Sequence, residues 1–403
     1  MSLSTYSLYG QELTLDSILN TIKSNNPMLL QYDQRVNAMN AYTEGAKSWM
    51  APMIGGGTFM TAYPYSTIMD ERDKGAVMIS AQQEIPNPAK LRAKKEFFSS
   101  KAGIEESNKE ATFNELRAEA KQLYYQWLVL EKKKLVLKEN QNIMEMMKKL
   151  AEIRYPYSQG SLNNVYKAEG RLYEVQNMLL MTDAEIEQKN IMLNTLMNLP
   201  KSNRFKIDTS KNIAGAIIQN LDTTNLAHSR SDVRALDRTI ESMRLNTQLM
   251  RFDAKPDFNI RYDHMSPLGQ GMPSQFTVMA MMTIPIAPWS SKMYKSQVKG
   301  MNYEIEAMKR ERENILNEAE GMVKSMVVEI QRKQQQLDNY EKKIIPALQK
   351  NYSTVMLAYE ENKGELPLVI DAWEAMNMAQ MEYLNNLEQL YLMIVTYEKE
   401  LEK

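Results

Sequence analysis

The sequence predicts a mainly helical protein that also carries two β-hairpins, arranged as two repeats of one unit. Three observations predict this fold class: two very long stretches without proline, two segments in which polar and apolar residues alternate, and a similarity between the two halves of the chain. Each repeat is expected to run helix, β-hairpin, very long helix, tight turn, helix.

The composition excludes several classes of protein. The 403 residues include 49 Lys and Arg, 50 Asp and Glu, two His and no Cys, so the formal net charge is −1. A near-neutral chain has no electrostatic reason to bind nucleic acid. The lack of Cys excludes disulfides, thiolate metal sites and a cysteine nucleophile. Because His228 and His264 have no neighbouring ligand motif, we expect no metal and no other cofactor.

Two stretches without proline, 89–155 and 289–345, are rich in residues that favour helices. Each would form a helix ~90–100 Å long at ~1.5 Å per residue. Apolar residues recur every seven positions in both, at Leu116, Leu123, Leu130, Leu137 and Met144, and at Val323, Ile330, Leu337 and Ile344. This spacing favours coiled-coil packing. A long amphipathic helix in a bundle is the alternative.

Two segments break the helical pattern, and both are expected to form hairpins. In residues 257–264 the even positions are Phe, Ile, Tyr and His, whereas the odd positions are Asp, Asn, Arg and Asp. A turn rich in Pro and Gly follows, and apolar residues then alternate again from Phe276 to Ile284. A period of two predicts strands. The arms of ~9–11 residues have the length that a transmembrane β-strand needs.

The two halves of the chain match when one is shifted by 204 residues. The matching pairs are Asp33 and Asp237, Val36 and Ile240, Met39 and Met243, Pro52 and Pro256, Tyr155 and Tyr359, Gly160 and Gly364, Leu162 and Leu366. We therefore expect a first repeat at 12–200, with its hairpin at 53–85, long helix at 89–154 and second helix at 161–199. A linking segment, 201–228, precedes the second repeat at 229–403, with hairpin 257–285, long helix 289–358 and second helix 365–400.

Four strands from one chain leave two open edges. In lipid every backbone N–H and C=O must be paired, so only a closed barrel can span the bilayer. Several copies together could close such a barrel; two soluble hairpins packed on a helical body are the alternative.

No run approaches ~18–20 consecutive apolar residues, so no transmembrane helix is expected. Residues 1–10 lack the basic start and apolar core of a signal peptide.

Several phrases, in order along nearly the whole chain, resemble the TolC-like family of outer membrane factors. They are Leu13–Asp16 followed by Asn26-Pro27, then Arg230–Ala235, Ile284-Pro285-Ile286, and Pro346 followed by Tyr359. The resemblance is nearest to the branch that serves heavy-metal and related RND-type pumps. It implies a homotrimer with a twelve-stranded β-barrel in the outer membrane of a Gram-negative bacterium. A long coiled-coil α-barrel would extend into the periplasm, with 201–228 in an equatorial belt.

The same resemblance implies a function without catalysis. The protein would be the outer-membrane exit duct of a tripartite efflux pump, in contact with outer-membrane lipid. Its partners would be a periplasmic adaptor (membrane fusion) protein and an inner-membrane RND-type pump. Two alternatives stay open: a type I secretion duct, and a soluble coiled-coil scaffold.

The resemblance also points to the two helix-to-helix turns as the functional end. In both, a Tyr precedes an Ala by 13 residues, as in Tyr155 to Ala168. The implied periplasmic gate contains Asp371 and Tyr359, and the implied adaptor-contacting tips contain Tyr155, Gly160, Leu162, Gly364 and Leu366. Three copies of Asp371 would ring a pore and attract cations; the alternative is a surface residue near a helix N-terminus.

Two features of these segments need a structural explanation. Gly160 and Gly364 are expected to reverse the chain with a positive φ, which Gly tolerates. Methionine is abundant, at 32 Met against 8 Phe, with groups at 144–147 and 376–381. Thioether sulfur can ligate soft metals, but at helical spacing we expect these residues to fill the core.

Overall fold

The computed structural model describes residues 12–61, 70–157, 160–209, 227 and 229–402. The chain divides into two compact units. The sheet unit comprises 32–108 and 232–315, and the helical unit comprises 1–31, 109–231 and 316–403. Each unit therefore draws on both predicted repeats, because the two longest helices each contribute to both units.

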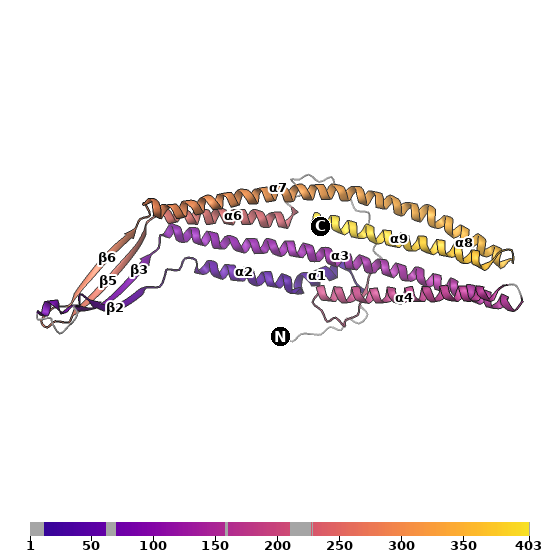
Figure 1. The fold of residues 1–403 in the computed structure, drawn as a ribbon, viewed down its shortest axis with the longest axis horizontal. Helices are drawn as coiled ribbons and strands as arrows, with labels where there is room; N and C mark the ends of the chain where they lie inside the picture. The colour runs from indigo at the N-terminus through magenta and orange to yellow at the C-terminus, as the bar shows by residue number, and fades with distance from the viewer. Residues whose placement is uncertain (1–11, 62–69, 158–159, 210–226, 228, 403) are drawn as a thin grey trace. The chain divides into compact units, whose positions relative to one another are not determined.

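The sheet unit is built around four antiparallel strands in the order β2-β3-β5-β6, which lie side by side in Figure 1. They are β2 (Met53–Phe59), β3 (Ala76–Ile85), β5 (Asp257–Pro267) and β6 (Gln275–Thr283). The central pair β3–β5 joins the two predicted hairpins, in a register from Ala76 opposite Pro267 to Ile85 opposite Phe258. The predicted strands are therefore confirmed, and they form one continuous sheet.

Helices lead into and out of the sheet. The sheet unit contains α2 (Pro27–Gly45), α6 (Ser231–Arg251) and the first parts of α3 (Pro88–Arg154) and α7 (Pro288–Asn339), apart from a few residues at the start of α2 and α6. Both long helices begin at a proline a few residues after a strand, at Pro88 after β3 and at Pro288 after β6. Proline has its φ preset for a helix and lacks the N–H that would be unpaired at this position.

The helical unit holds the rest of α3 and α7 with α1 (Leu15–Asn25), α4 (Leu162–Leu196), α8 (Ile345–Glu360) and α9 (Leu366–Glu400). A short parallel pair, β1 (Glu12–Leu13) with β4 (Lys206–Ile207), adds to it. The heptad residues of α3 all lie in its core, with Leu116, Leu123, Leu130, Leu137 and Met144 at most 6% exposed. The seven-residue spacing therefore marks the buried side of this helix.

The second long helix differs from the prediction. Instead of one helix over 289–358, α7 ends at Asn339, a π-helical turn covers Tyr340–Ile344, and α8 continues to Glu360. Pro346 explains the change, because its ring would clash with the carbonyl of residue 342 in a regular α-helix. The N–H of Ile345 reaches back to the carbonyl of Tyr340 instead. The extra residue of a π-turn shifts the heptads, and Ile344 is 39% exposed.

The order of elements in the first half of the chain recurs in the second, whereas the exact bounds of the two repeats stay a prediction. Of the linking segment 201–228, only 201–209 and 227 are among the described residues, and His228 lies outside them. In the part of the chain that the structure describes, no helix combines the length and the apolar character needed to cross a membrane.

Candidate functional site

The sheet has one apolar and one polar face. On the apolar face, Phe258 pairs with Met282, Ile260 with Ala280 and Tyr262 with Val278. These side chains are open to solvent in the single chain: Phe258, Ile260, Tyr262, Val278 and Met282 are between 43% and 60% exposed. An exposed apolar surface of this extent usually marks a site that contacts another protein or a membrane.

The opposite face carries charged and amide side chains together with methionines, among them Met279 and Met281 on β6, which lie opposite Arg261 and Asn259. Gln82 and Glu84 on β3 face the same side as their partners Arg261 and Asn259 on β5. Arg261 donates from Nε to Oδ1 of Asp263 at 2.9 Å, and Asp263 is only 2% exposed. Both residues lie on β5, so Arg261 supplies, within one strand, the partner that the buried carboxylate of Asp263 needs.

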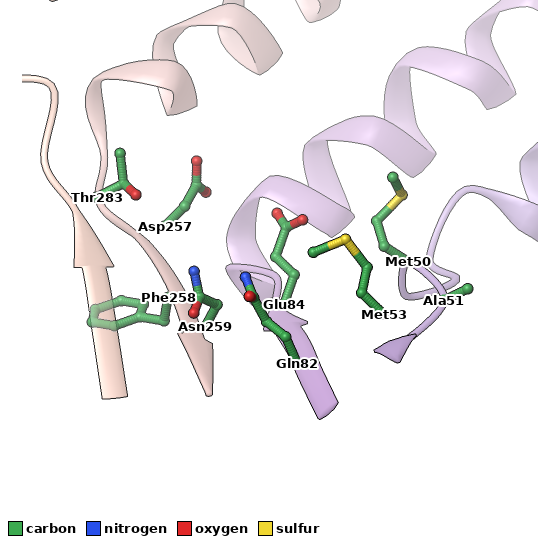
Figure 2. A pocket seen from close by; sticks show the side chains of 9 residues that line it. All are labelled: Met50, Ala51, Met53, Gln82, Glu84, Asp257, Phe258, Asn259 and Thr283. Atoms are coloured by element: carbon green, nitrogen blue, oxygen red, sulfur yellow. The ribbon is translucent and has the colours of Figure 1, made fainter. Parts of the chain in front are cut away.

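A hollow of about 440 Å³ lies where the strands meet the segments that lead to the helices. Figure 2 shows Met50 and Met53 beside it, with Glu84 and Asp257 directed toward the same side. Lys90 lies 3.9 Å from Asp257 and 3.1 Å from Asp253. The hollow therefore has an acidic and thioether lining at the edge of the polar face. Among the described residues, no group of three or more His, Asp or Glu is placed to hold a metal ion.

The helix-to-helix turn between α8 and α9 belongs to the helical unit. The N–H of Lys363 bonds to the carbonyl of Ala358 at 2.8 Å, and the N–H of Asn362 bonds to that of Tyr359 at 3.0 Å. This pair of bonds is a Schellman motif, which ends a helix with one residue in the left-handed region. That residue is Asn362, with φ 59.

The expected role of glycine is therefore wrong for Gly364, which is not among the residues with positive φ. The segment before Gly160 lies outside the described residues, so the expectation for Gly160 stays a prediction. Gly364 lies at a close approach instead, because a Cβ at this position would be 3.3 Å from the backbone N of Tyr359, a tight contact. Asparagine tolerates the left-handed region, since its short polar side chain can bond locally.

Tyr359 is almost fully buried, with 4% of its surface exposed. Arg154, the last residue of α3, lies over its ring, with 4.1 Å between the guanidinium carbon and the ring centroid. Arg154 also donates to the carbonyls of Tyr359 at 2.7 Å and Glu360 at 3.1 Å. A cation at the C-terminus of a helix is favourable for the helix dipole. Arg154 thus joins the end of α3 to the end of α8.

Asp371 forms an exposed ion pair with Lys167 on α4, at 3.2 Å between Nζ and Oδ1. One turn further on, Arg171 of α4 pairs with Glu374 of α9, and also with Glu174 at 2.6 Å. The hydrogen bond with Glu174 is the main reason that the pKa of Arg171 is raised. These contacts connect the α3–α4 pair to the α8–α9 pair.

The remaining predicted tip residues divide into exposed and buried ones. Tyr155 and Leu162 are exposed, at 46% and 41%, and Gly160 is partly exposed. Leu366 is fully buried and belongs to the core beneath the turns. Leu366 therefore supports the turn from inside, whereas Tyr155 and Leu162 offer a surface.

Sequence reasoning missed Arg154, Lys167 and Arg171. One signal could have found Lys167, because it lies 204 residues before Asp371, at the repeat-related position on the other helix. Only some of the grouped methionines fill the core as expected. Met144 and Met147 are fully buried, whereas Met378 is 70% exposed.

No model of a known protein family matches the sequence, and comparison with curated proteins also finds no match. Solved structures do match. The outer-membrane channel OprN has 16% identity and a TM-score of 0.77, with 96% of this chain and 89% of that chain covered. CusC, described in connection with transmembrane channel formation, has 13% identity and a TM-score of 0.77, with coverage of 99% and 95%. The outer membrane protein VceC of Vibrio cholerae has 13% identity and a TM-score of 0.74, with coverage of 96% and 95%.

The likeness to these channels extends over nearly the whole chain. It confirms the predicted fold class of long helices with β-hairpins. The chain therefore has the fold of TolC-like outer membrane factors.

Proposed function

We propose that the chain is one protomer of a homotrimeric outer-membrane channel, the exit duct of a tripartite efflux pump in a Gram-negative bacterium. The observation that carries this proposal is the two-faced sheet with two open edges. Three copies would supply twelve strands and close the edges, with the apolar face against lipid and the polar face toward water. The shared fold with OprN, CusC and VceC supports it.

The duct itself is passive in this proposal. A periplasmic adaptor would dock at the exposed side chains of the turns, Tyr155 and Leu162, and at the backbone near Gly160 and Gly364. The buried Leu366 would shape this surface without forming it. The inner-membrane partner would be an RND-type pump. More specifically, we propose that the chain belongs to the branch that serves heavy-metal pumps. OprN and CusC have the same TM-score, so the branch rests on the sequence phrases alone.

We further propose that the contacts between α4 and α9 hold the periplasmic end of the duct closed. Asp371 would lie toward the pore, where three carboxylates attract cations. Its pair with Lys167 and the Arg154–Tyr359 stack each connect the two helix pairs of one protomer. Separation of the pairs would break both contacts and widen the pore.

The test is single-channel conductance of the detergent-purified protein in a planar bilayer, after its mass has been checked for a trimer. Insertion with a small, cation-preferring conductance is the expected result. A protein that stays in solution without detergent and never inserts would contradict the duct and favour the coiled-coil scaffold. A channel that transports substrate only together with an ABC exporter encoded beside it would point to type I secretion.

A further inference from the structure

A cluster of three lysines lies at the start of α7, directly after the last strand of the sheet. Lys292, Lys295 and Lys299 are exposed and follow one another at spacings of three and four residues. This spacing places them on one side of the helix. They line a shallow hollow of about 460 Å³ together with Ile286, Pro288 and Ser296.

The lysines have no acidic partner in the part of the chain that the structure describes. Lys295 lies 3.3 Å from the hydroxyl of Ser291, which is itself only 6% exposed. Lys295 and Lys299 lie 6.0 and 5.9 Å from the rings of Tyr294 and Tyr303. No carboxylate is close by in the sequence either, because residues 288–303 contain no Asp or Glu. The cluster is a concentrated positive charge without a counter-charge.

The surroundings of the cluster are apolar on the side of the sheet. The chain from His264 to Ser291 contains no Asp, Glu, Lys or Arg. The exposed apolar row of β6, Phe276, Val278 and Met282, continues past the strand to Ile284 and Ile286, and Ile286 is 81% exposed. Trp289 follows and is 82% exposed. Along the chain, an apolar row is thus followed by an exposed tryptophan and then by lysines.

This order matches the layers of a membrane surface. Tryptophan is favoured at the level of the headgroups, and lysine side chains extend past it to reach water or phosphate. Each Lys near an anionic bilayer strengthens binding to it roughly fivefold. A small free anion would not contact the exposed apolar side chains of Trp289 and Ile286. The combination of lysines with these side chains therefore favours a lipid over a small ion.

We propose that Lys292, Lys295 and Lys299 bind the phosphate of an anionic phospholipid headgroup, with Trp289 and Ile286 against its acyl chains. The site would fix the level of the barrel in the membrane at the end where α7 begins. This inference rests on the proposed function, because it requires that the apolar face of the sheet be in lipid.

The experiment uses the full-length protein, purified in detergent and reconstituted in vesicles of phosphatidylcholine alone or with phosphatidylglycerol. The amount of phosphatidylglycerol retained after delipidation is measured by mass spectrometry. The triple variant K292Q/K295Q/K299Q is expected to bind phosphatidylglycerol roughly a hundredfold more weakly and so to retain much less of it. A matched variant with the same change of charge, K342Q/K343Q/K350Q in the helical unit, is expected to retain as much as the parent.

Further arms separate the possible outcomes. Trp289→Ser is expected to weaken retention of the lipid as well, and excess inorganic phosphate is expected not to displace it. Displacement by phosphate would overturn the lipid in favour of a small anion. Equal retention by both triple variants would overturn the site. So would loss of trimers by K292Q/K295Q/K299Q in the absence of lipid, because the lysines would then contact a neighbouring copy.

The two proposals fail in different ways. If the parent protein enters neither type of vesicle, the duct is wrong and the headgroup site falls with it. If the parent inserts equally well in both and retains no phosphatidylglycerol, only the headgroup site is wrong.

Discussion

Asp371 and Lys167 form a pair whose importance depends on position rather than strength. An exposed ion pair contributes ~0.2–1 kcal/mol, which shifts an equilibrium by up to about fivefold. We expect Asp371→Ala to raise the open fraction of the channel by up to this factor for each protomer and to reduce its preference for cations. Lys167→Ala should raise the open fraction without that loss of preference. Single-channel recording in a planar bilayer measures both quantities.

The control for this prediction is Asp183→Ala. Asp183 also lies on α4 in an exposed pair, with Lys134 at 2.5 Å, but this pair connects α4 to α3 within one helix pair. An equal effect of Asp183→Ala and Asp371→Ala would show that any lost surface charge changes the channel, and the gate would be wrong.

Asn362 carries the left-handed backbone of the α8–α9 turn. A side chain with a Cβ and no local hydrogen bond pays ~1–2 kcal/mol in this region. We therefore expect Asn362→Ala to destabilise the turn by about 1 kcal/mol, whereas Asn362→Gly should be nearly neutral. Hydrogen exchange of the amides of 358–366 measures this. Equal protection in both variants would contradict the assignment.

Glu169 on α4 contributes a stability that depends on pH. Its hydrogen bond with Lys148, at 2.6 Å, lowers its pKa below the ordinary 4.5 and raises the pKa of Lys148. A lowered carboxyl pKa stabilises the fold above the unfolded value and is lost as the pH falls through the folded value. We expect the parent to melt slightly above Glu169→Gln at pH 7, and the difference to shrink below pH 4.5 and to vanish once the pH is below the lowered pKa of Glu169. A difference that persists there would contradict the pair.

Single residues of the tip were only partly predictable. The sequence indicates that the chain turns near Gly160 and Gly364, but the left-handed residue is Asn362. A glycine can serve for backbone conformation or for close approach, and only the structure separates these uses. Arg154 was not predictable, because its partners are carbonyls of a helix that lies 205 residues away in sequence.

At the scale of elements, α3 shows how far periodicity reaches. Leu130 lies in the core and is 3% exposed, whereas Leu135 on the same helix is 65% exposed. We expect Leu130→Ala to cost ~2–5 kcal/mol of unfolding free energy and Leu135→Ala to cost under ~0.5 kcal/mol. Chemical denaturation followed by circular dichroism measures both. Similar costs would mean that the assembled protein buries Leu135 as well.

The strands and the long helices were predictable because each follows one simple period. The π-turn was not, because periodicity alone does not say how a helix accommodates Pro346. The regular spacing of Val323, Ile330 and Leu337 continues to Ile344 in the sequence, yet the additional residue of the turn places Ile344 outside the core.

For the whole molecule, the proposed function places the apolar face of the sheet in lipid and the opposite face toward water. Val278 and Thr277 are neighbours on β6 and point to opposite faces. A lysine at the bilayer midplane costs ~2–4 kcal/mol on the lipid side. We expect Val278→Lys to reduce insertion into vesicles strongly and Thr277→Lys to leave it nearly unchanged. The reverse ranking would mean that the faces are assigned the wrong way round.

The proposed trimer could be argued from the sequence only through the resemblance and the number of strands. Physical reasoning establishes that four strands need partners, but it does not fix how many copies supply them. Which helices of neighbouring copies meet depends on side-chain fit between surfaces, and one sequence holds no direct signal for that fit.

The outer strands have a further consequence for how the protein is made. In the described sheet β2 and β6 each pair on one side only, so a newly made chain has two rows of unpaired backbone groups beside an apolar face. Such edges join readily to any other strand. Productive assembly then depends on the concentration of finished chains and competes with aggregation. Overproduction should therefore fill inclusion bodies unless a holdase covers the strands until partner chains pair with them.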